Sequence, residues 1–188
     1  HLKALVDGNK TYVIYDSVLD IDDNQSRVPT SGEIRLATRT TLDPDAWKYR
    51  TLESPTTDAA ILGYDVEIAK SSRGIMASWF SATALSMPDP TLLRTLNLST
   101  AAAVLTTSTS NYGTPNELLS SDSKTLLFNC LGRLCAIDYV KFSKGQSAIA
   151  LASSWQSTEP IASAWIVLNK VRYAVAGING KVVLLKAA

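Results

Sequence analysis

The stretch Leu2-Lys-Ala-Leu-Val-Asp-Gly-Asn-Lys-Thr-Tyr-Val-Ile-Tyr15 holds two short apolar runs on either side of Asp7-Gly8-Asn9. Branched and aromatic residues favour strands, and an Asp-Gly pair between two such runs is typical of a tight hairpin turn. Further strand-like runs follow at 33–37 and 47–52. The first 58 residues therefore predict a unit of four short antiparallel strands.

The same order of strand, tight turn, strand, loop and strand recurs three more times along the chain. The expected units cover residues 1–58, 59–115, 116–160 and 161–188. In the last three units the first strands are expected at 64–68, 125–128 and 164–167, the second strands at 75–79, 135–139 and 171–175, and the third strands at 92–96, 148–152 and 181–185. A fourth strand is expected at 103–107 in the second unit and after Trp155 in the third, whereas the last unit ends after three strands.

Tandem units of this size predict an all-β fold in which about four small antiparallel sheets stack as the blades of a β-propeller-like array. Stacking would explain why residues 75–80 are nearly all apolar rather than alternating, because both faces of such a strand are covered. The alternative is a β-sandwich built from the same strands. Either architecture accounts for residues 1–188 as a single domain.

Composition narrows the classes of function. The chain has 188 residues, with 18 Lys and Arg against 17 Asp and Glu, for a net charge of +1. Such a balance argues against a nucleic-acid partner, and no run of 18 mostly apolar residues predicts a membrane span. The only histidine of the sequence is His1, so no internal histidine is present to act as a base or a metal ligand.

One family resemblance is carried by residues 1–80. The runs Tyr12-Val-Ile-Tyr-Asp16 and Glu33-Ile-Arg-Leu-Ala-Thr-Arg39, followed by Trp47, resemble the BNR/sialidase-like β-propeller repeat, and residues 138–155 repeat the pattern more loosely. The Asp-box of that family is absent. The rhythm of the strands is also similar to that of fungal propeller lectins, although their ligand-binding Arg and Glu do not recur once per unit here. The resemblance implies a propeller with binding loops, or a degenerate glycoside hydrolase.

The two cysteines, Cys130 and Cys135, flank Leu131-Gly132-Arg133-Leu134, which predicts a hairpin with a four-residue loop. Residues beside such a loop face each other with Cβ atoms about 4.5–5.5 Å apart, close to the distance of a disulfide. A Cys130–Cys135 bridge is therefore expected, and it would indicate a secreted or cell-surface location. The alternative is two free thiols on one hairpin.

Candidate ligand-binding residues come from the repeated positions. Arg35 and Arg94 occupy matching places in the third strands of two units, where an arginine cluster could hold a carboxylate. Trp47 and Trp155 follow third strands, where an indole could stack on a sugar ring, and Asp16 opens a long loop. The alternatives are packing between blades for the two indoles and solvation for the arginines.

Alternate oxygen-bearing residues in one loop indicate a candidate calcium site. Asp20, Asp22, Asn24 and Ser26 have the spacing of the first ligands in a calcium loop. Gln25 stands where an EF-hand needs glycine, and Ser31 stands where it needs a bidentate glutamate. The alternative is an acidic surface loop, and no other cofactor is expected.

The sequence therefore predicts a secreted or cell-surface module that recognises a glycan or a protein through its propeller loops, notably 16–32 and 81–90. One alternative is a structural, self-assembling β protein. In that case an incomplete propeller would leave an apolar blade face bare and a second copy would complete it as a homo-oligomer. The other alternative is a degenerate sialidase-like glycoside hydrolase.

Overall fold

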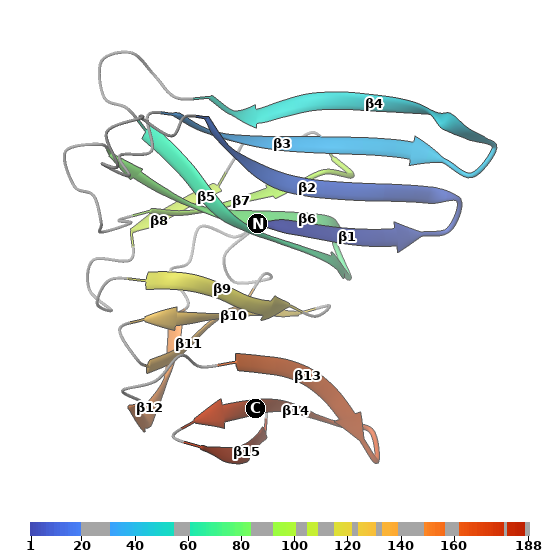
Figure 1. Cartoon of the computed structure of the whole chain (residues 1–188). Coiled ribbons are helices and arrows are strands. Elements are labelled where there is room, and N and C mark those ends of the chain that lie inside the picture. The colour runs from blue at the N-terminus through green and yellow to red at the C-terminus, as the bar shows by residue number, and fades with distance from the viewer. Residues whose placement is uncertain are drawn as a thin grey trace.

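The structure is a computed structural model. It describes residues 1–19, 31–54, 61–83, 92–100, 105–108, 115–121, 124–130, 133–138, 149–156, 162–178 and 180–186. These residues contain fifteen strands in four antiparallel sheets and no helix (Figure 1). The all-β prediction is confirmed, and no described helix has the length and apolar character needed to cross a bilayer.

Each sheet is formed by consecutive strands of the chain. The first sheet comprises β1 (Leu2–Asp7), β2 (Lys10–Leu19), β3 (Ser31–Thr40) and β4 (Asp43–Glu53), and the second comprises β5 (Ile61–Ser71), β6 (Gly74–Thr83), β7 (Leu92–Asn97) and β8 (Leu105–Ser108). The third sheet comprises β9 (Pro115–Ser121), β10 (Thr125–Cys130), β11 (Arg133–Asp138) and β12 (Ile149–Gln156), and the fourth comprises β13 (Ala162–Leu168), β14 (Val171–Ile178) and β15 (Lys181–Lys186). Four tandem meanders are thus present, as the repeat predicted.

The third sheet differs from the prediction at one edge. Its fourth strand is β9, which precedes β10 and pairs with it, and Trp155 lies inside β12. The segment Pro115-Asn-Glu-Leu-Leu-Ser-Ser121 has no β-branched or aromatic residue, so it carries no local strand signal. Its ladder to β10 is interrupted by two register shifts, and the strand therefore forms by pairing rather than by propensity.

Two apolar clusters join the first three sheets. One lies between the first and second sheets and includes Ile14, Leu36 and Trp79, and the other lies between the second and third sheets and includes Phe80 and Phe128. The rings of Phe80 and Phe128 meet edge to face at 5.9 Å, a geometry that adds about 0.5–1.5 kcal/mol to simple burial. Neighbouring residues of β6 therefore face opposite clusters, which explains why residues 75–80 are nearly all apolar.

The first strands of successive sheets lie against one another. β5 contacts β1, β9 contacts β5, and β13 contacts β9. Lys3 of β1 pairs with Glu67 of β5 at 3.3 Å, and Asp7 further along β1 pairs with Lys70 further along β5, so the two strands run parallel across the gap between sheets. The sheets thus stack in chain order as open, sandwich-like layers, with the first and fourth at opposite ends of the stack (Figure 1).

The predicted Cys130–Cys135 disulfide is wrong. β10 and β11 are joined by two residues rather than four, so the register pairs Cys130 with Arg133 and Cys135 with Phe128. The cysteines are diagonal neighbours, about 7–8 Å apart in such a ladder and beyond the reach of a bridge. Cys135 is a buried free thiol in the apolar cluster between the second and third sheets.

Candidate functional site

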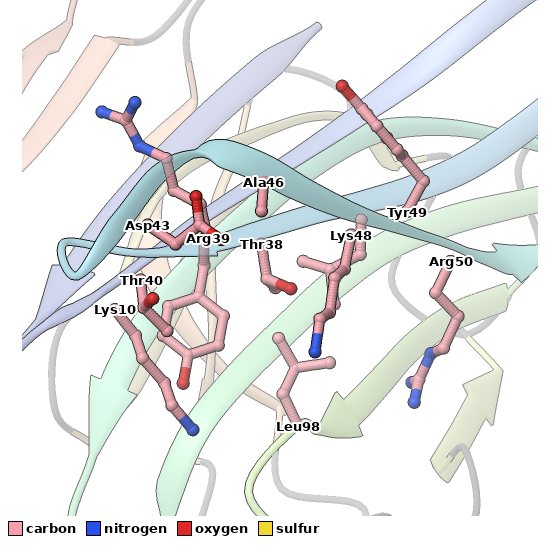
Figure 2. A pocket seen from close by; sticks show the side chains of 12 residues that line it. Lys10, Thr38, Arg39, Thr40, Asp43, Ala46, Lys48, Tyr49, Arg50 and Leu98 are labelled. Atoms are coloured by element: carbon pink, nitrogen blue, oxygen red, sulfur yellow. The ribbon is translucent and has the colours of Figure 1, made fainter.

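A groove of about 500 Å³ lies against the first sheet, near the ends of its hairpins. Its walls come from β2, β3 and β4, and Leu98, which follows β7, contributes from the second sheet (Figure 2). Four cationic residues line the groove: Lys10, Lys48, Arg50 and Arg39, whose guanidinium lies over the Trp47 ring. The lining also includes the hydroxyl-bearing residues Tyr12, Thr38 and Thr40 and the apolar residues Leu36 and Leu98. This size is ordinary for a small-molecule or sugar site.

The register of the first sheet places these side chains on one face. Tyr12 pairs with Thr38, and Thr38 pairs with Lys48, which gives one row across three strands. Leu36 pairs with Arg50 in the next row. Because side chains alternate along a strand, Lys48 and Arg50 point to the same side of the sheet (Figure 2).

The floor and the rim of the groove differ in character. Leu36 is buried, and Tyr12 and Leu98 pack partly buried against the same apolar cluster. Lys10, Lys48 and Arg50 are exposed at the rim. Within the described residues none of these three cations has an ion-pair partner, although Asp43 also lines the groove. Ammonium and guanidinium groups beside hydroxyls are donors suited to a carboxylate or a sulfate.

Two of the predicted ligand residues lie on the opposite face of the first sheet. Arg35 is exposed and bonds Glu33 at 2.6 Å, and this carboxylate raises the pKa of Arg35 above its ordinary value. Trp47 is half-buried with the Arg39 guanidinium 4.8 Å over its ring. A shallow pocket of about 370 Å³ beside Tyr15 includes Arg35 but not Trp47. Neither residue reaches the groove.

Asp16 holds two sheets together. Its side chain is 3% exposed and accepts a hydrogen bond from the backbone amide of Asp65 at 2.8 Å. It also contacts the terminal amine and ring of His1. The position singled out for a ligand is thus occupied by contacts between β1, β2 and β5.

Arg94 belongs to a buried polar cluster between the first and second sheets. Glu53, at the end of β4, accepts hydrogen bonds from Trp79 Nε1 and from Ser81 Oγ, the latter at 2.9 Å. Arg94 Nε lies 3.4 Å from Glu53 Oε1, an ion pair without hydrogen-bond geometry. Arg94 pairs across the ladder with Trp79, which faces the first sheet, whereas Arg35 faces away from it. The two arginines therefore do not form one cluster.

The remaining predictions fall outside the described side chains. Trp155 is described only as part of the backbone of β12, and the calcium candidates Asp20, Asp22, Asn24 and Ser26 lie outside the described residues. Groups of three or more potential metal ligands are absent from the part of the chain that the structure describes. Most of the expected binding loops 16–32 and 81–90 is likewise undescribed.

The groove itself was not predicted from the sequence. The available signal was the alternation Trp47-Lys48-Tyr49-Arg50, which places two cations on one face of a strand. Lys10 could be added only once the pairing of β2 with β3 was known, because it lies some forty residues from Arg50 in the sequence. The groove also lies at the end of the sheet with tight turns, not at the end with long loops.

No protein-family model matches the sequence, and no curated protein matches it either. The geometry of the groove is therefore the basis for assigning a function to the chain.

Proposed function

We propose that this chain is a binding module that recognises an acidic glycan in the groove of the first sheet. The observation that carries this proposal is the convergence of Lys10, Lys48 and Arg50, without ion-pair partners among the described residues, above an apolar floor. A sugar acid or sulfated sugar has both parts of the complementary surface. Its anion meets the cationic rim, and the apolar face of its ring lies on Leu36 and Tyr12.

We further propose that the four sheets are the blades of a propeller-like array. The support is that β1, β5, β9 and β13, the first strands of the four sheets, follow one another in contact. Blades of a propeller are arranged in this way, each a small antiparallel sheet with its first strand nearest the axis. Both faces of the second sheet are covered, as an internal blade requires.

Acidic glycans are displayed outside cells, so the proposal places the chain in secreted or cell-surface material. This placement rests on the class of ligand alone. The disulfide that the sequence predicted does not support it, because Cys135 is a free thiol.

The test begins with an array that carries acidic glycans beside neutral glycans of the same backbone. We expect binding to acidic members, and a preference for neutral members would contradict the proposal. The strongest acidic glycan is then titrated calorimetrically into the double variant Lys48→Ala/Arg50→Ala. Each lost charge-assisted hydrogen bond is worth about 1.5–3 kcal/mol, so the affinity should fall by at least about tenfold.

A charge-matched control separates the groove from general attraction. Arg73 and Lys181 are exposed and line neither the groove nor the shallow pocket. The variant Arg73→Ala/Lys181→Ala has the same net charge as the groove variant and should bind within about twofold of the wild type, since screening weakens distant charges. Equal losses in both variants would show non-specific attraction.

A further inference from the structure

The outward face of the fourth sheet is apolar and largely exposed. Its register aligns Ala164, Val175 and Leu184 in one row, and Val182 lies further along the same face of β15. Val182 is 78% exposed and Leu184 is 55% exposed. An apolar sheet face of this kind normally marks an interaction surface.

The opposite face of the same sheet is covered by the third sheet. Ala174 and Ala176 are buried there, and Arg172 donates a hydrogen bond to Thr125 of β10 at 3.2 Å. The fourth sheet therefore packs on the sheet that precedes it in the chain, as the second sheet does, but no other described sheet packs on its second face.

The outward face of the first sheet is the other end of the stack. One row across it contains Ala4, Val13, Ala37 and Tyr49. Leu2 and Tyr49 are mostly exposed on this face, whereas its inward face is buried against the second sheet. The stack thus ends in two different exposed faces: the outward face of the first sheet and the outward face of the fourth sheet.

We propose that two copies of this chain associate head to tail, with the first sheet of each copy packed on the fourth sheet of the other. Such a contact repeats the packing already made between neighbouring sheets within the chain, with β1 of one copy following β13 of the next. Two copies joined at both ends give a closed ring of eight sheets, within the range of about four to eight blades known for propellers.

The size of the faces favours two contacts over one. β14 has eight residues, so the fourth sheet presents a face of about 25 Å by about 15 Å, from the usual rise per residue and strand spacing. Two such faces per copy give about 750 Å², close to the roughly 800 Å² per partner of a standard stable interface. A single end-to-end contact would reach about half of that. This inference does not depend on the ligand of the groove.

The experiment is light scattering after size-exclusion chromatography of the full chain over a range of concentrations. We expect a mass of twice 20.2 kDa for the wild type. The tail variant Val182→Lys/Leu184→Lys and the head variant Leu2→Glu/Tyr49→Glu should both run at 20.2 kDa. All four positions are exposed, so circular dichroism should show folded proteins in each case.

Leu42 supplies the matched control. It is 87% exposed but lies in the turn between β3 and β4, outside the paired rows that form the outward face of the first sheet, and Leu42→Glu should remain a dimer. A wild type that is monomeric at every concentration would overturn the proposal. Loss of the dimer in the tail variant alone would indicate tail-to-tail pairing, and a mass that grows without limit would indicate open chains; either result also overturns the closed pair.

Discussion

The second and fourth sheets are built from the same kind of hairpins, yet they differ in how many of their faces are covered. In the second sheet, Trp79 faces the first sheet and Phe80 faces the third, and both are fully buried. In the fourth sheet, Ala174 and Ala176 are buried on one face while Val182 and Leu184 remain exposed on the other. The two sheets therefore have similar strand patterns but different tertiary environments.

This difference shows what a strand sequence encodes in a stacked array. An apolar run makes both faces of a strand suitable for burial. The position of the sheet in the stack then decides whether both faces are buried within one chain. For the second sheet the neighbours are present. For the fourth sheet the outward face is exposed, and the proposed second copy would cover it.

The largest expected effect on stability comes from removing a large buried side chain of the second sheet, which is covered on both faces. Trp79→Ala removes the largest fully buried side chain among the described residues and one of the hydrogen-bond donors to Glu53, so the free energy of unfolding should fall by about 3–5 kcal/mol. Urea unfolding followed by circular dichroism measures this change. The partly buried Trp165 of the fourth sheet is the control, and a loss from Trp165→Ala as large as that from Trp79→Ala would erase the contrast between the sheets.

The next effect comes from the buried polar cluster of the second sheet. Glu53→Ala removes the hydrogen-bond acceptor of the Trp79 indole N–H and the Ser81 hydroxyl, and it leaves Arg94 without its carboxylate partner. The free energy of unfolding should therefore fall by about 2–3 kcal/mol. Glu33→Ala, on the outward face of the first sheet, breaks an exposed pair and should change the urea midpoint little. Comparable losses in the two variants would mean that the cluster is not buried as described.

Two glycines with positive φ, one in the second sheet and one in the fourth, allow the same comparison to be made at turns. Gly74 begins β6 at a φ of +123°, and an added Cβ would lie 2.6 Å from Ser99 Oγ, which accepts the Ile75 amide hydrogen bond. Gly74→Ala should therefore cost about 2 kcal/mol, through backbone strain and the lost contact. Gly180 of the fourth sheet has a φ of +68° with open space around it, so Gly180→Ala should cost only about 1 kcal/mol. Thermal denaturation of the two variants gives the order, and a reversed order would contradict it.

The sequence predicted the doubly covered sheet better than it predicted the edges and the groove. Residues 75–80 are nearly all apolar and so predicted burial on both faces, because a strand with one solvated face alternates apolar and polar residues. β9 was missed because it lacks branched residues, and the register of Cys130 and Cys135 was missed because a shorter turn shifts the partner of each residue. The groove depends on rows that cross three strands, and such rows follow from the ladder rather than from any local motif.

The smallest expected effect lies on the bare face of the fourth sheet and depends on protein concentration. In dilute solution Leu184→Ala removes little buried surface, so the free energy of unfolding should change by less than about 0.5 kcal/mol. Leu93→Ala, a fully buried position in the second sheet, should cost about 2–5 kcal/mol under the same conditions. As the concentration rises, association stabilises the folded wild type by mass action, so its melting temperature should rise while that of Leu184→Ala rises less. Calorimetric melting curves over a hundredfold range of concentration measure both slopes. Parallel slopes for the wild type and Leu184→Ala would mean that this face stays uncovered in solution, and the two sheets would then differ in burial under all conditions.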